Sequence, residues 1–231
     1  MSPILSRLIS SVGGGAVGGI RRKQDSSNSV AGNVSWYFDG ADYVFCPSSS
    51  TLALGSGDFT IEMWIKPDDT NQRTWIGWVN DSPMFEYDSG YRWYSANIGG
   101  IDLKGGTIST GVWQHIAVSR TSTTIQIYKN GTRVATGIDD RNFTNNTPVL
   151  GARNSGFGSG TVHFKGYISN LRLIKGTSIY NGTTIIVPTS PLTAVSNTQL
   201  LTFQDTTLID KSANNHTLSN TGSTFSSDGP F

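Results

Sequence analysis

The sequence predicts an all-β fold, a two-sheet antiparallel jelly-roll sandwich preceded by an extended N-terminal arm. Three observations support this prediction. Only 14% of the residues are charged and glutamate occurs only at Glu62 and Glu86, whereas glycine (27 residues), serine, threonine and asparagine are abundant. Beyond residue 30, apolar residues alternate with a period of two, and no segment carries a 3.6-residue stripe. The pair Asn130-Gly131, between two β-rich runs, predicts a two-residue hairpin.

Residues 1–32 form the predicted arm, and residues 33–231 the predicted sandwich. The arm begins with an apolar cluster, continues through the flexible sequence GGGAVGG, and then carries a basic cluster. A disordered tail is the alternative, but such tails seldom carry an apolar cluster followed by a basic one. We therefore expect the arm to order on a partner. Its predicted partner-binding residues are Ile4, Leu5, Leu8, Ile9, Arg21, Arg22 and Lys23.

Charge also separates the arm from the body. Residues 1–30 hold four basic residues and one acidic residue, whereas the remainder holds 13 basic and 15 acidic residues. A nearly neutral body lacks the basic surface that nucleic-acid binding requires, and no apolar stretch is long enough to span a membrane. The basic cluster follows the apolar stretch, so no export signal is predicted. The single cysteine, Cys46, excludes an internal disulfide and is expected to be buried.

The strands follow in order. Residues 59–67 alternate strictly, whereas residues 111–120 are largely apolar on both faces, as in a central strand that is covered on both sides. The hairpin occupies residues 123–137. Further strands are expected within residues 163–176, 198–203 and 215–222.

The order of these segments resembles the laminin-G-like branch of the concanavalin A-like lectin/glucanase superfamily. The segments that carry the resemblance are WYFDGADYV (36–44), GSGDFTIEMWIKP (55–67), GVWQHIAVSR (111–120), IQIYKNGTRVATG (125–137), PVLGAR (148–153), FKGYISNLRLIKGTSIY (164–180), NTQLLTF (197–203) and LIDKSANNHTL (208–218). The variant RLIKGTSIYNG with a late LLTF and IDKS is similar to domains in structural proteins of marine and cyanobacterial bacteriophages.

Together with the arm, this resemblance implies a non-enzymatic virion structural protein, a capsid decoration or tail-associated subunit. It would be made in the host cytoplasm and located in the phage particle. Its partners would be other virion proteins, with self-association and a host surface glycan as further possibilities. Because the family includes lectins, adhesins, glycosidases and spacers, the alternative is a carbohydrate-binding module or adhesin.

Catalysis on this fold requires paired carboxylates, which the glucanase branch supplies in an E-x-D-x-x-E pattern. Neither Glu62 nor Glu86 lies in that pattern. Glu86 and Asp88 would share a strand face at a spacing compatible with a dyad, but we favour a solvated loop or edge for them. His115, His163 and His216 are far apart in sequence, and His115 fits a core position better than a base. No catalytic residue is predicted.

Seven aromatic residues gather within residues 75–94, where they could bind a sugar, contact a protein or pack in the core. Taking Trp75 and Trp93 as inward-facing leaves Trp78, Tyr91 and Tyr94 as the predicted exposed contacts.

Calcium is the one ion that the sequence allows. Asp39 and Asp42, with Asp210 and Asn215, offer oxygen ligands near the two ends of the domain. Turn residues are the alternative, because Asp and Asn favour turns for conformational reasons. Asn170 stands where many relatives carry an acidic residue, which weakens the metal prediction, so the expected cofactor is none.

Overall fold

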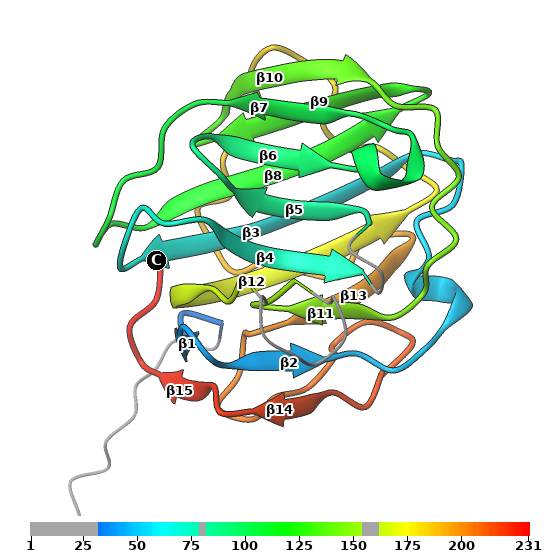
Figure 1. The fold of residues 1–231 in the computed structure, drawn as a ribbon. Coiled ribbons are helices and arrows are strands. Elements are labelled where there is room, and N and C mark those ends of the chain that lie inside the picture. The colour runs from blue at the N-terminus through cyan, green and yellow to red at the C-terminus, as the bar shows by residue number, and fades with distance from the viewer. Residues whose placement is uncertain (1–31, 79–81, 154–161) are drawn as a thin grey trace, which may run out of the picture.

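The computed structural model describes residues 32–78, 82–153 and 162–231, which form two antiparallel β-sheets packed face to face (Figure 1). The predicted two-sheet sandwich is therefore confirmed. The arm residues Ile4, Leu5, Leu8, Ile9, Arg21, Arg22 and Lys23 lie outside the described residues. Gly32, which the prediction assigns to the arm, is buried in the sandwich, and its carbonyl oxygen accepts a 2.9 Å hydrogen bond from Asn170 Nδ2.

Consecutive strands repeatedly cross from one sheet to the other, as a jelly roll requires. The first sheet has the spatial order β10 (Thr132–Ile138), β9 (Thr124–Lys129), β8 (Gln114–Thr121), β3 (Phe59–Pro67), β12 (Lys165–Lys175), β1 (Ser35–Asp39) and β15 (Thr224–Ser226), and β13 (Thr198–Thr202) pairs with β12. The second has the order β14 (Ser219–Thr221), β2 (Tyr43–Phe45), β11 (Pro148–Leu150), β4 (Arg73–Trp78), β5 (Met84–Tyr87), β6 (Tyr91–Tyr94) and β7 (Asp102–Gly105). The short 3-10 helices η1 (Ser50–Leu52) and η3 (Ala96–Ile98) lie in connections.

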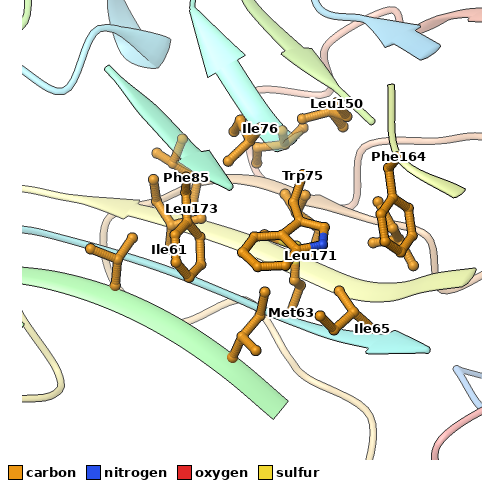
Figure 2. Close-up of a cluster of buried hydrophobic side chains, with 14 of the residues drawn as sticks. Ile61, Met63, Ile65, Trp75, Ile76, Phe85, Leu150, Phe164, Leu171 and Leu173 are labelled. Atoms are coloured by element: carbon orange, nitrogen blue, oxygen red, sulfur yellow. The ribbon is translucent and has the colours of Figure 1, made fainter. Parts of the chain in front are cut away.

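The hydrophobic core lies between the sheets. Figure 2 shows Ile61, Met63 and Ile65 of β3 on the same side of their strand, with Trp75 of β4 and Phe85 of β5 contributed by the second sheet. All five side chains are fully buried and belong to one cluster. The intervening residues of β3 face away from the core, so the period of two fixes which residues can form an outer surface.

Several local predictions are confirmed. Lys129 pairs with Thr132 around the Asn130-Gly131 turn, where both residues adopt the positive φ angles (45° and 83°) that a tight hairpin requires. All residues of β8 except Thr121 are buried, so this strand is covered on both faces. Cys46 is a buried free cysteine, and burial raises the pKa of its thiol. Among the described residues, no helix has the length and apolar character needed to cross a membrane.

Candidate functional site

Trp78 and Tyr91 are buried, so the prediction that they are exposed contacts is wrong. The strand pairing shifts by one residue between Thr74 and Ile76, a β-bulge that turns both Trp75 and Ile76 toward the core and reverses the alternation for Trp78. Trp78 Nε1 then donates a 2.9 Å hydrogen bond to the carbonyl oxygen of Leu52.

Tyr91 lies two residues from Trp93 on β6, so both side chains face the core, and its hydroxyl donates to Gln114 Oε1 at 2.8 Å. Tyr94 has the opposite orientation and is half-buried. The Arg92 guanidinium lies 4.2 Å from the centre of the Tyr94 ring, so one face of that ring is already occupied. The predicted aromatic surface therefore retains only Tyr94.

The outer face of the second sheet carries an ionic network centred on Glu86. Glu86 and Arg92 are register partners on β5 and β6, with Arg92 Nη1 2.8 Å from Glu86 Oε1 and 2.9 Å from Asp88 Oδ2. The prediction that Glu86 and Asp88 share a face is confirmed. The prediction that Glu86 is solvated is wrong, because its side chain is fully buried between this arginine and Arg153, whose Nη2 lies 3.1 Å from both carboxylate oxygens.

The same network extends into solvent at its edge. Arg92 also binds Asp102 through two bonds of 2.7 and 2.8 Å, and Lys104 Nζ lies 2.9 Å from Asp88. The hydrogen bonds from Arg92 lower the pKa of Asp102 despite partial burial. Each carboxylate of this network thus lies within hydrogen-bond distance of a cation, an arrangement suited to structural charge balance.

On the first sheet, Glu62 of β3 likewise has an arginine as its register partner and is also fully buried. Its register partner Arg172 binds Oε1 through Nε at 2.9 Å, while His115 Nε2 (3.1 Å) and the Tyr180 hydroxyl (2.8 Å) bind Oε2. Burial alone would raise the pKa of Glu62, but the hydrogen bond from His115 and the charge of Arg172 outweigh it and lower that pKa. A carboxylate only accepts, so His115 carries its proton on Nε2.

Glu62 and Glu86 therefore lie on opposite sheets, each surrounded by its own hydrogen-bond donors. Glu62 and Glu86 thus do not form the pair of carboxylates flanking a common substrate position that glycoside hydrolysis needs.

The four calcium candidates act as turn and loop residues. Asp39 Oδ1 accepts from Ala41 N at 2.7 Å, and Asp42 Oδ2 accepts from Asp39 N at 3.0 Å. Asp210 is buried and accepts from three backbone amides, those of Leu201, Ser212 and His216.

Asn215 has a positive φ of 48°, and its backbone N–H donates a hydrogen bond to the carbonyl oxygen of Ser212. Among the described residues, no group of three or more His, Cys, Asp or Glu residues is placed to hold a metal ion. The calcium site stays a prediction; in the structure these residues order the turns, as Asp and Asn side chains commonly do.

An aromatic row that sequence reasoning missed lies on the outer face of the first sheet. We define it as Tyr37 (β1), Tyr167 (β12), Lys66 (β3) and Trp113, which precedes β8. Tyr37 pairs with Tyr167, and Tyr167 pairs with Lys66, across neighbouring strands. The ring centres of Tyr37 and Tyr167 lie 4.9 Å apart and those of Tyr167 and Trp113 6.3 Å apart.

Every member of this row is half-buried, so its rings present accessible apolar surface beside polar groups. Lys66 Nζ lies 4.8 Å from the Tyr167 ring centre, and the Tyr37 hydroxyl donates to Asp68 at 3.1 Å. Burial, followed by the hydrogen bond to Asp68, raises the pKa of Tyr37 to about 12. The outward phase of each residue could be taken from the sequence, but their meeting depends on strand order and register, which it does not contain.

Comparisons with known proteins place this geometry in a family. The model of the concanavalin A-like lectin/glucanases superfamily matches residues 38–177. The native heptameric SAP-like pentraxin from Limulus polyphemus is similar in structure, with a TM-score of 0.54, 15% identity, and coverage of 64% of this chain and 79% of the pentraxin.

Two further structures have lower TM-scores. Domains LG4-5 of the mouse laminin alpha1 chain give 0.49, with 17% identity over 62% of this chain and 41% of theirs. Domain 4 of an extracellular GH43 arabinanase from Geobacillus stearothermophilus, in complex with arabinotriose, gives 0.42, with 22% identity over 60% and 69%. No curated protein sequence matches. On the family match and the sandwich geometry, the chain belongs to the concanavalin A-like lectin/glucanase superfamily.

Proposed function

We propose that this chain is a non-enzymatic structural protein of a bacteriophage particle, a capsid decoration or tail-associated subunit. Its N-terminal segment would bind other virion proteins while the sandwich is displayed outward. The observation that carries the proposal is the apolar and then cationic pattern of residues 1–31, joined at Gly32 to a sandwich that completes its own core. The two buried, ion-paired glutamates support the non-enzymatic part.

The proposal is tested by co-sedimentation with assembled phage particles and with their purified shell and tail components. The full chain is compared with a version that starts at Gly32, which retains the hydrogen bond to Asn170. We expect only the full chain to sediment with one component, with both versions equally folded. Equal sedimentation of the two versions would contradict the proposal.

A charge variant sharpens this test. Replacing Arg21, Arg22 and Lys23 by Gln should weaken sedimentation at low salt if the arm binds an acidic surface, and the difference from the unmodified chain should shrink at high salt, which screens the attraction. The matched control replaces Lys165, Lys175 and Lys211 of the sandwich by Gln, which removes the same charge and should leave sedimentation unchanged. Equal effects of the two triple variants would point to net charge rather than to the arm.

Glycan recognition is the second candidate function, and the aromatic row favours it over the site that the sequence suggested. Two half-buried rings on neighbouring strands and a third just before β8 lie near the Lys66 ammonium and the Asp68 carboxylate, and so combine apolar faces for a sugar ring with groups that bind hydroxyls. A glycan array probed with the full chain should then give binders. Trp113→Ala should weaken them at least tenfold, while Tyr94→Ala, on the other sheet, should leave them unchanged. An array without binders would sink this second function.

A further inference from the structure

Residues 226–231, which we name the clasp, lie across the outer face of the first sheet beside the aromatic row. The chain runs from β15 toward the end of β3 (Figure 1). Asp228 forms an ion pair with Lys66 and accepts a 3.3 Å hydrogen bond from Trp113 Nε1. The ring of Phe231 packs edge-on against Trp64, which lies two residues before Lys66 on the same face of β3, with 5.6 Å between ring centres.

The clasp also holds the first described residues of the chain. The backbone amide of Phe231 donates to Asn33 Oδ1 at 2.9 Å, and Asn33 Nδ2 donates back to the Phe231 oxygen. Ser35 Oγ donates to the carbonyl oxygen of Asp228 at 2.5 Å. One short segment therefore binds both the point where the N-terminal segment joins the sandwich and the polar groups of the aromatic row.

These contacts determine what the aromatic row can offer a ligand. Asp228 occupies its two nitrogen donors, the Lys66 ammonium and the Trp113 indole, and Phe231 covers part of Trp64. Trp64 Nε1 and His115 Nδ1, on register partners of β3 and β8, are buried without a hydrogen-bond partner among the described residues. Because Phe231 packs on the Trp64 ring, opening the clasp would expose this ring to solvent or to a ligand.

We infer that the clasp regulates the aromatic row: it competes with a ligand for Lys66 and Trp113, and its closure is coupled to the N-terminal segment through Asn33. This inference rests on the glycan-recognition function proposed above. A partner whose binding to the preceding residues draws Asn33 away from Phe231 would favour the open clasp, adding two free donors and the Trp64 ring to the row. By reciprocity, a ligand on the row would favour release of Asn33.

Tryptophan fluorescence quenched by acrylamide tests the clasp without any glycan. Trp64 and Trp113 are half-buried, whereas Trp36, Trp75, Trp78 and Trp93 are buried, so quenching reports on the two rings beside the clasp. In the full chain, Asp228→Asn should raise the quenching constant at least twofold, and Phe231→Ala should do the same. The matched control is Asp205→Asn, which breaks a surface aspartate–lysine pair of similar exposure elsewhere and should change nothing.

The outcomes separate the parts of the inference. Unchanged quenching in both Asp228→Asn and Phe231→Ala overturns the clasp. Raised quenching in these variants, but not in Asn33→Ala, overturns the coupling to the N-terminal segment. On the glycan array, Asp228→Asn should bind at least threefold more strongly than the unmodified chain. If quenching rises but neither the unmodified chain nor Asp228→Asn binds a glycan, the clasp is supported and the glycan function is refuted. If Asp228→Asn binds glycans more weakly, Asp228 is itself a ligand contact and the proposed competition is refuted.

Discussion

The two sheets carry the same device on their outer faces and use it differently. In each sheet a fully buried glutamate pairs with an arginine that is its register partner on the neighbouring strand, Glu62 with Arg172 and Glu86 with Arg92. On the first sheet the pair is closed over by the chain, because Tyr180 binds Glu62 and the carbonyl oxygen of Thr193 accepts from Arg172 Nη1 at 2.6 Å.

On the second sheet the pair continues outward. Arg92 forms ion pairs with Asp88 and Asp102, and Lys104 forms one with Asp88. The Asp88, Asp102 and Lys104 side chains are 31% to 40% exposed. The first pair therefore fastens Tyr180 and Thr193 to the sheet. The second links charged side chains of β5, β6 and β7 at the solvent boundary. Both glutamate–arginine pairs are buried, so they differ in what surrounds them: the chain covers the first, whereas solvent can replace the outer contacts of the second.

The largest expected effect comes from breaking the closed pair. Arg172→Met should lower the free energy of unfolding by about 3–5 kcal/mol, because it leaves the buried Glu62 charge without its cation. Urea unfolding measures the loss. The double variant Glu62→Met/Arg172→Met should recover at least half of it, since no unpaired charge remains. A loss below about 1 kcal/mol in the single variant would show that His115 and Tyr180 suffice to hold Glu62.

The open pair should tolerate the same change better. Arg92→Met removes one cation from Glu86, but Arg153 Nη2 and the Thr74 hydroxyl, at 2.8 Å, still bind that carboxylate. We expect a loss of about 1–3 kcal/mol in urea unfolding, the range for hydrogen bonds to charged groups. A loss equal to that of Arg172→Met would remove the distinction between the two faces.

The stability of the protein should depend on pH through the titration of Glu62 in the closed pair. The folded-state pKa of Glu62 lies below its unfolded value of about 4.3, so its stabilising contribution is present above that value and is lost as pH falls through the folded pKa. Glu62→Gln should therefore flatten stability against pH below about pH 5, by up to about 1.4 kcal/mol per pH unit. Urea unfolding from pH 7 to pH 3 tests this, and parallel curves for the two proteins would contradict it.

The sequence was sufficient to predict the strands of the sheets, but not which side chains meet on their outer faces. Alternation identified β3, apolar residues on both faces identified β8, and the Asn130-Gly131 pair identified the hairpin, because each of these signals is local to its segment. The prediction that Trp78 is exposed was wrong because one bulge reverses the inward–outward alternation within β4, and nothing in RTWIGW marks where the extra residue lies.

The contacts that form the outer-face sites could not be predicted for a different reason. Glu62 and Arg172 are 110 residues apart, and Tyr37 and Tyr167 meet only because β1 enters the sheet beside β12. Each partner is visible in the sequence as an outward residue on a strand, but their contact depends on which strands are neighbours and in which register. The Asp39 and Asp42 carboxylates show the converse: short-range spacing identified them, and short-range turn bonding is what they form.

The smallest expected effect tests the solvent edge of the open pair. Asp102→Asn removes a carboxylate with 40% exposure whose pKa is lowered by its bonds from Arg92. Because solvent screens such a pair, we expect a loss of only about 0.3–0.5 kcal/mol at low salt, and less at 1 M NaCl, where the Debye length falls to about 3 Å. Tyr180→Phe is the comparison on the first sheet: it removes a partly buried hydrogen bond to the buried Glu62 and should cost about 1 kcal/mol. Its cost should change little with salt, because the bond is shielded from mobile ions. If the two costs fell in parallel as salt increased, the first pair would be as accessible to solvent as the second, and the chain crossing above it would not be a tight cover.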